Sequence, residues 1–337
     1  MIGKEHRMLR FGVIGTSWIT NSYVDGALDS GLWELTAIYS RTREKGLAFG
    51  EQYGVTTVFT DLTEMAQSDL IDAVYIASPN MLHMEHARIC LENGKHVICE
   101  KPLSAHAETV KALQQLADER GLIFLEAIMF MHLPQCKLLE EALTKIGGVN
   151  MAKLDFCQRS SKLDAYLKGE LPNIFNPKLE TGALMDLGVY CIYPALHLFG
   201  QPQKMTAAAH MLESGADSGG SVGMVYPDKL VNIAYSKIGQ AAANTDFQGN
   251  LGTLYVESIS KLENMEIIYR DGTREFVFGA EPKHKLMGYE AKDFYRYITE
   301  PEASAEEYNY CRKLALDVSV CMETLRQMAG IRFPSDV

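Results

Sequence analysis

The sequence predicts an α/β protein, with an N-terminal doubly wound parallel sheet and a C-terminal α+β domain that has a large, mostly antiparallel sheet. In about the first 125 residues, short apolar runs alternate with amphipathic stretches, which is typical of strand–helix units in a parallel sheet. Beyond residue 126, strand-like runs follow one another, and turn pairs such as Pro227-Asp228 and Asp271-Gly272 separate several of them. We therefore expect one domain at residues 8–125 and a second at residues 126–337.

The elements of the first domain follow from the period of their apolar residues. Strand candidates are Leu9–Ile14, Leu35–Tyr39, Thr57–Phe59, Ala73–Ala77, His96–Cys99 and Leu122–Leu125. Helix candidates are Ile19–Ser30, Arg43–Tyr53, Leu62–Gln67, Met81–Asn93 and Ala105–Arg120. Gly94 and Gly121 follow two of these helices, at the position where a helix C-cap favours glycine. Residues 1–7 are expected to be a disordered leader, with Met8 as a candidate start.

The second domain has a different order of elements. Helix candidates are Leu133–Ile146, Gly182–Phe199, Tyr289–Tyr297 and Ala305–Met328. Strand candidates are Asn150–Gln158, Lys204–Met211, Gly220–Val225, Leu230–Ser236, Ala242–Gln248, Gly252–Ser258, Met265–Tyr269 and Arg274–Phe278. The uninterrupted run of strands predicts an antiparallel sheet with helices beside it.

Composition limits the class of protein. The chain has 337 residues, of which 47% are hydrophobic and 22% charged, an ordinary globular composition that is sufficient for two domains. The net charge of −11 argues against nucleic acid as the main partner, because phosphate binding needs a surplus of Lys and Arg. The seven cysteines form no CxxC pair, so we interpret them as reduced thiols of a cytoplasmic protein. No apolar stretch reaches the about 18 residues of a membrane helix, and no signal peptide is evident.

The first predicted strand runs directly into Gly15-Thr16-Ser17-Trp18-Ile19-Thr20, which opens the first helix. A small-residue turn here lets the backbone approach a pyrophosphate at a helix N-terminus, where N–H groups and the helix dipole favour anions. The usual fingerprint is GxGxxG or GxGxxA, and here Ser17 and Thr20 take the second and third small positions. We predict that residues 15–19 bind a dinucleotide; an ordinary strand-to-helix turn is the alternative.

The end of the second predicted strand indicates which dinucleotide is bound. NAD enzymes usually place Asp or Glu there, to accept hydrogen bonds from the adenosine ribose. Residues 37–43 contain no carboxylate, and Ser40 and Arg41 can instead hold a 2′-phosphate, which an acid would repel. NADP is therefore the expected cofactor, with NAD as the other possibility. The alternative is that Arg41 and Arg43 are solvated loop charges.

The fourth and fifth predicted strands also end in polar residues. Ser78-Pro79-Asn80 follows the fourth strand with His83 just beyond, and the fifth ends at Glu100-Lys101-Pro102. A lysine just past a buried strand needs a partner, because burial of an ammonium is costly, and Glu100 is the candidate. Lys101 can then donate to a substrate oxygen or take part in proton transfer while a nicotinamide carries the hydride. The alternative is an exposed loop lysine beside a structural proline, whose peptide bond is a candidate for the cis form.

These motifs, in this order, resemble the glucose–fructose oxidoreductase / inositol dehydrogenase family (Gfo/Idh/MocA), and the resemblance covers nearly the whole chain. Residues 126–135, from Glu126 onward, are similar to the family's entry into its second domain, and residues 182–190 to its second signature. With Tyr190 four residues after Asp186, the signature is most similar to the dimeric dihydrodiol dehydrogenase and xylose dehydrogenase type. Inositol dehydrogenases usually carry His at this position, which disfavours an inositol substrate.

The resemblance implies a Rossmann domain that binds NAD(P), with Glu126 in the cofactor site, and a second domain that binds substrate. It implies that Lys101 and Tyr190 flank the reacting carbon and that Asp186 orients them or the substrate. By spacing alone, Asp186 and Tyr190 share a helix face, and a phenol there can exchange a proton with a substrate oxygen. The proton donor is left open, because Lys101 and Tyr190 titrate as a coupled set. A ring packed in a core is the alternative role of Tyr190.

We therefore expect an NAD(P)-dependent oxidoreductase that transfers a hydride between the nicotinamide and a carbinol or carbonyl carbon of a sugar, polyol or cyclic diol. Family members commonly dimerise through the broad sheet, so we expect a homodimer or higher homo-oligomer that binds neither nucleic acid nor membrane. Two alternatives are a non-catalytic cofactor-sensing regulator and an NAD-dependent glycoside hydrolase. His83 and His86 are three residues apart, but no third ligand is suggested, so we expect no metal site; His83 is expected to contact the cofactor loop.

Overall fold

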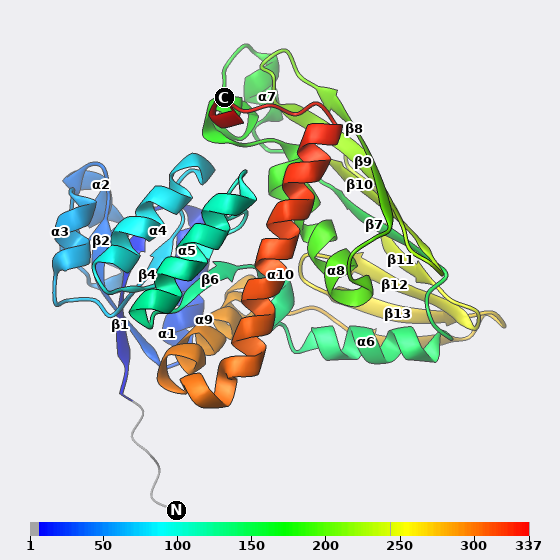
Figure 1. Cartoon of the computed structure of the whole chain (residues 1–337), viewed down its shortest axis with the longest axis horizontal. Helices are drawn as coiled ribbons and strands as arrows, with labels where there is room; N and C mark the ends of the chain where they lie inside the picture. The colour runs from blue at the N-terminus through cyan, green and yellow to red at the C-terminus, as the bar shows by residue number, and fades with distance from the viewer. Residues whose placement is uncertain (1–6, 243, 337) are drawn as a thin grey trace, which may run out of the picture. The chain divides into compact units, whose positions relative to one another are not determined.

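The computed structural model of the chain describes residues 7–242 and 244–336 (Figure 1). Residues 1–6 of the expected leader lie outside the described part. The chain forms two compact units, each assembled from separate stretches of sequence. The first unit contains the residues up to Ser104, Glu108–His132 and Pro282–Ala315; the second contains Ala105–Ala107, Leu133–Glu281 and the residues from Leu316 onward.

The first unit is built on a sheet of six parallel strands in the order β3-β2-β1-β4-β5-β6, which confirms the doubly wound fold. The strands are β1 (Leu9–Ile14), β2 (Trp33–Tyr39), β3 (Val58–Phe59), β4 (Ala73–Ile76), β5 (His96–Glu100) and β6 (Phe124–Ala127). The helices between them are α1 (Trp18–Asp29), α2 (Arg43–Gly50), α3 (Leu62–Gln67), α4 (His83–Glu92) and α5 (Ala107–Arg120). Every residue of β4 and β6 is buried, as expected where helices cover both faces of a parallel sheet.

A helix from the far end of the chain completes this unit. Helix α9 (Lys283–Thr299) packs on α1, and a Cβ added at Gly26 would collide with the backbone of His284 and Gly288, so the two helices approach backbone to backbone. Trp33 at the start of β2 donates from Nε1 to the carbonyl of Ala291 at 2.8 Å. The predicted division at residue 125 was into two domains that are each continuous in sequence, and it stays a prediction. The contacts between residues group the chain into two units that are each discontinuous in sequence.

The second unit has an eight-stranded sheet in the order β14-β13-β12-β11-β7-β10-β9-β8, in which only β7 and β10 pair in parallel among the described pairs. The strands are β7 (Met151–Cys157), β8 (Lys204–Met211), β9 (Asp217–Val225), β10 (Leu230–Ser236), β11 (Thr245–Gln248), β12 (Gly252–Ser258), β13 (Glu263–Tyr269) and β14 (Arg274–Phe278). Its helices are α6 (Gln135–Lys145), α7 (Leu163–Leu167) and α8 (Val189–Phe199), and α10 (Pro301–Met328) begins in the first unit and ends here. Alternate residues of β7 and β10 are buried beneath α8, which gives the unit its core.

Several observed elements have other bounds than those predicted; α10, for example, begins at Pro301 and not at Ala305. The helix predicted from residue 182 begins with a π-helical turn, Leu184–Gly188, before α8. The segment between β7 and that turn contains α7 and two 3₁₀ turns, where polar residues gave no periodic signal. Helix α9 begins six residues before the predicted Tyr289, at Lys283. No helix in the described part of the chain is long and apolar enough to cross a membrane.

Candidate active site

The turn between β1 and α1 has the form that a pyrophosphate site requires. Gly15 adopts φ +112°, and a Cβ there would lie 2.5 Å from the carbonyl oxygen of Ala77 at the end of β4. Only glycine fits, because the conformation is left-handed and the neighbouring backbone leaves no room for a side chain. Any side chain at residue 15 would fill the space inside this turn. The turn lies at the point where the strand order reverses from β1 to β4, which is where doubly wound sheets bind their ligands.

The residues after this glycine begin helix α1, and the side chain of its N-cap residue makes no capping hydrogen bond to the helix N-terminus. Ser17 is the N-cap in extended conformation, and the first turn carries no acidic residue. Thr20 is fully buried, whereas Trp18 is 67% exposed. The ammonium of Lys283, at the start of α9, lies 4.3 Å from the centre of the Trp18 ring. A positive helix end and a cation held by an aromatic ring together suit an anionic ligand.

The end of β2 also has the expected form. Ser40 is buried and its N–H donates to the carbonyl of Phe59 at 3.1 Å, which fixes the strand end. Arg41 is exposed. Arg43 differs from it, because its guanidinium donates to the carbonyl of Val58 at 3.1 Å. Arg41 thus follows β2 as an exposed residue, and its contact with a 2′-phosphate stays a prediction.

His83 links the two loops that follow β4 and β5. Its Nε2 lies 2.8 Å from the carbonyl oxygen of Ser78, and its Nδ1 lies 3.0 Å from that of Pro102. Burial lowers the pKa of His83 to about 4, so the ring is neutral and donates to one of the two carbonyls at a time. The expected contact of His83 with the Ser78 loop is present, and the ring also reaches the loop that contains Lys101.

Glu100, the predicted partner of Lys101, also has a buried partner on the neighbouring strand. The hydroxyl of Tyr75 donates to Oε1 of Glu100 at 2.6 Å, and Tyr75 in turn stacks on Tyr23. Burial raises the pKa of Glu100, and the charge of Lys101 opposes that rise. Tyr75 is thus a further partner of Glu100, which the sequence motif did not reveal because Tyr75 lies on the neighbouring strand.

The loop after β5 is tied to the end of β6. Glu126 is buried at that strand end, and its Oε1 accepts a hydrogen bond of 3.2 Å from the N–H of Leu103. The Lys101–Pro102 peptide bond is cis. Glu126 was predicted to bind the cofactor, and the structure shows it fixing the segment that follows Lys101.

In the second unit, the π-helical turn and α8 carry the other predicted residues. Asp186 accepts a hydrogen bond from the ammonium of Lys237, which lies just after β10 and whose side chain is only 5% exposed. The Tyr190 ring, in the first turn of α8, packs edge-on against Phe156 of β7. Lys237 is a site residue that the sequence analysis missed, because a lysine after a strand-like run gives no signal of its partner.

Asp217 is a second residue that the sequence analysis missed, and it binds the first residue of the π-helical turn. Asp217, at the beginning of β9, is fully buried and accepts from the N–H of Leu184 at 2.7 Å. A Cβ added at Gly182 would collide with the Asp217 carboxylate, which explains why the signature opens with glycine. Burial raises the pKa of Asp217 to about 6. The glycine was visible in the sequence, but the acid that requires it lies 35 residues away.

Two further histidines, His86 and His132, have partners within the first unit. His86 lies 3.1 Å from the Ser78 hydroxyl, and it contributes to no metal-binding group among the described residues. The ring of His132 is buried and its Nδ1 lies 2.9 Å from Asp293 of α9. The structure therefore places His83 and Glu126 at the loop after β5 in the first unit, and Asp186 and Tyr190 in one helical segment of the second unit.

Comparison with known families agrees with the fold and with these motifs. Residues 9–127 match the model described as an oxidoreductase family with an NAD-binding Rossmann fold, and residues 142–255 match the GFO/IDH/MocA C-terminal domain. The chain belongs to the Gfo/Idh/MocA oxidoreductase family, as its motifs indicated.

Individual relatives are similar along their whole length. The scyllo-inositol 2-dehydrogenase (NADP(+)) IolU of Bacillus subtilis is 40% identical over 329 residues, which cover 98% of this chain and 99% of the relative. A trans-1,2-dihydrobenzene-1,2-diol dehydrogenase of Mus musculus is 26% identical and covers 97% of this chain and 99% of its own. The crystal structure of the 3-ketoreductase KijD10 from Actinomadura kijaniata with NADP and TDP-benzene has the same fold. It gives a TM-score of 0.84 at 24% identity, over 95% of this chain and 98% of that one.

Proposed function

We propose that the protein is an NADP-dependent oxidoreductase that interconverts a carbinol and a carbonyl group of a polyol, sugar or cyclic diol. The observation that carries this proposal is the turn at Gly15, a backbone cradle at the switch point of a parallel sheet in a member of an NAD-binding family. The relatives agree, since their names describe NADP-dependent dehydrogenases and dihydrodiol dehydrogenases. The regulator and the glycoside hydrolase have no such support.

The residues present fit the cofactor. Residues 15–19 and the N-terminus of α1 would hold the pyrophosphate, and Ser40 with Arg41 the 2′-phosphate. The exposed Trp18 leaves the turn accessible, and Lys283 adds a positive charge beside it. When bound, the nicotinamide supplies or accepts the hydride.

The chain's own residues handle the proton that accompanies the hydride. In the reducing direction, the carbonyl oxygen gains a proton from either Lys101 or Tyr190, and in the oxidising direction the same pair takes a proton from the hydroxyl. Asp186, which is held by Lys237, orients the substrate or the Tyr190 phenol. His83 and Glu126 fix the loop that carries Lys101. We propose that Lys101 and Tyr190 act on the same substrate carbon.

The relatives change the order in which substrates are proposed. Tyr190 in place of His was expected to disfavour an inositol, but a relative with 40% identity is named a scyllo-inositol dehydrogenase. We therefore propose inositols and their ketones first, followed by aldoses, ketoses and cyclic diols.

Turnover of these substrates tests the proposal. NADPH oxidation or NADP reduction, followed by absorbance, should occur with at least one of them. Lys101→Ala should lower kcat by about 100-fold or more, because a positioned proton donor contributes about 10²–10⁴-fold. Lys111→Ala, at an exposed lysine of α5 with a weak ion pair to Glu108, is the matched control and should keep full activity. Equal activity of wild type and Lys101→Ala would refute the assignment.

We also propose that the protein is a cytoplasmic homo-oligomer. All seven cysteines are free thiols and six are buried, which suits a reducing compartment. Alternate residues of β7 and β12 are partly exposed, and we propose that a second copy covers this face of the eight-stranded sheet. Light scattering at micromolar concentration should give the mass of at least a dimer, and a monomeric mass would contradict the proposal.

A further inference from the structure

Three side chains that could hold a metal ion lie close together in the second unit. They belong to α6 and α8, two helices that Figure 1 labels. Cys136 and Glu140 are one turn apart on α6, and His197 is in the last turn of α8. Tyr190, in the first turn of α8, lies two helical turns from His197, so these residues are separate from those assigned to the reaction. No step of the proposed function uses them.

Their ligand atoms converge on one point. The Sγ of Cys136 lies 3.5 Å from Nε2 of His197, and the same nitrogen lies 2.9 Å from Oε1 of Glu140. All three ligand atoms lie within 4.8 Å of one another. A tetrahedral zinc ion with bonds of about 2.3 Å to sulfur and 2.0–2.1 Å to nitrogen separates the two ligands by about 3.5 Å, as found here. The exposed Glu140 has only to withdraw by a few tenths of an ångström to complete the third bond.

The contacts do not form a catalytic triad. In a Cys-His-acid triad the acid holds one ring nitrogen and the thiol uses the other, whereas here both face the same Nε2. Three donors that face one point instead suit a cation that replaces the proton between them.

We propose that Cys136, Glu140 and His197 form a binding site for a zinc-class divalent ion, in which water completes the coordination and the ion links α6 to α8. Thiolate and imidazole ligands favour Zn²⁺ and Co²⁺ over Mg²⁺ and Ca²⁺, which prefer oxygen ligands. Cys136 is buried, the side chain of His197 is 13% exposed and that of Glu140 is 49% exposed, so the ion enters from the Glu140 side.

Titration of the metal-free, untagged full chain with Co²⁺ tests this site. Wild type should develop the near-ultraviolet charge-transfer band of a cobalt–thiolate bond, and equimolar Zn²⁺ should remove it. Cys136→Ser should abolish the band, whereas Cys157→Ser, at a half-buried cysteine beside Asp155, should retain it. The absence of a band in wild type, or its loss in Cys157→Ser and not in Cys136→Ser, would overturn the proposal.

A second variant makes the test independent of core packing. Because Glu140 is exposed, Glu140→Gln should fold normally and bind Co²⁺ at least about 10-fold more weakly, since even the loss of a residue that supports a ligand costs that much. Unchanged affinity in this variant would remove Glu140 from the site and refute the three-ligand assignment. Neither readout depends on enzymatic activity.

Discussion

Two arginines between β2 and the first turn of α2, Arg41 and Arg43, differ in their surroundings. Arg41 is exposed, whereas Arg43 donates to the carbonyl of Val58 and so ties α2 to β3. A charge-assisted hydrogen bond to a phosphate is worth about 1.5–3 kcal/mol, and only Arg41 has a guanidinium that can be offered to a ligand without a loss to the fold. The two residues therefore have separable effects on cofactor selection and on stability.

Arg41→Ala should weaken NADPH binding by about 10- to 100-fold and leave NADH binding nearly unchanged, because only the 2′-phosphate loses its partner. Binding of each cofactor can be followed by nicotinamide fluorescence. Arg43→Ala is the matched control, in which the ratio of the two affinities should stay as in wild type while the denaturation midpoint falls. An equal loss for both cofactors in Arg41→Ala would remove the 2′-phosphate role.

At the scale of one element, the start of the π-helical turn depends on a buried acid. Asp217 accepts from the N–H of Leu184, and its pKa is raised to about 6 mainly by burial. The folded state thus keeps this proton to higher pH than the unfolded state, in which an Asp loses it near its ordinary value of about 3.9. Between these two values, stability falls as the pH rises, and it stays lower above the folded pKa.

Asp217→Asn should remove this pH dependence while keeping an oxygen that can accept from Leu184. From about pH 4 to about pH 7, wild type should lose up to about 3 kcal/mol of stability more than the variant does. Urea denaturation midpoints at the two pH values, compared between the two proteins, measure the difference. Parallel pH profiles would show that Asp217 does not titrate in this range.

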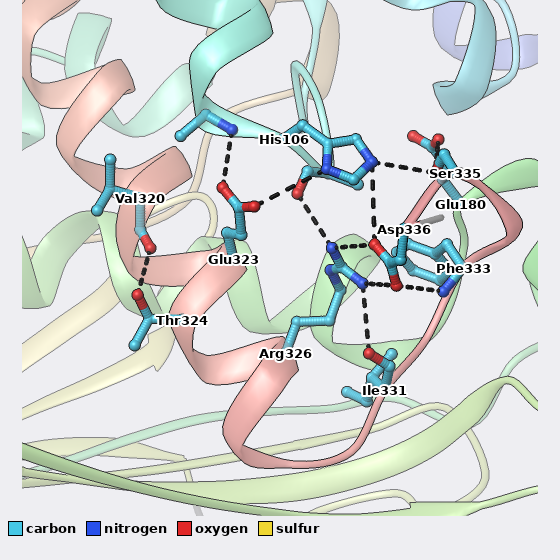
Figure 2. A network of polar contacts seen from close by, with 12 residues as sticks. His106, Glu180, Val320, Glu323, Thr324, Arg326, Ile331, Phe333, Ser335 and Asp336 are labelled. Atoms are coloured by element: carbon cyan, nitrogen blue, oxygen red, sulfur yellow. Dashed lines mark hydrogen bonds and ion pairs between the residues drawn. The ribbon is translucent and has the colours of Figure 1, made fainter.

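At the scale of the whole molecule, residues distant in sequence meet around Arg326 (Figure 2). Its guanidinium is buried near the end of α10 and makes two hydrogen bonds, of 2.6 and 2.7 Å, to Asp336. The pKa of Asp336 is lowered, chiefly by that contact. His106, just before α5, lies 3.1 Å from the hydroxyl of Ser335, which donates to Glu180 at 2.6 Å. This network explains why residues 105–107 group with the second unit and not with the Rossmann sheet.

Asp336→Asn should destabilise the second unit by about 3 kcal/mol, because it leaves the buried charge of Arg326 without a carboxylate. The double variant Arg326→Met, Asp336→Asn should recover much of that loss, since it removes the unpaired charge and keeps an apolar side chain of similar length. Thermal unfolding of the three proteins at neutral pH gives the comparison. A double variant that is less stable than the single one would show that the ion pair itself contributes the stability.

The sequence alone determined the fold class and most of the strands, because these depend on local periodicity. Leu9–Ile14 and Leu230–Ser236, for example, have the predicted bounds, and each shows the burial expected of its sheet. It also placed Gly15 and Arg41 at strand ends, since strand direction fixes which end of a parallel sheet receives a ligand.

Only the tertiary structure decided which residues meet across the chain. The phenol of Tyr75 on Glu100, the ammonium of Lys237 on Asp186 and the zinc-class site of α6 and α8 depend on the register of neighbouring strands and the packing of helices. No local period encodes such pairs, because a hydrogen bond depends on distance in space and not on separation in sequence. The grouping of α9 with the first unit has the same origin, since it depends on a backbone contact between Gly26 and Gly288.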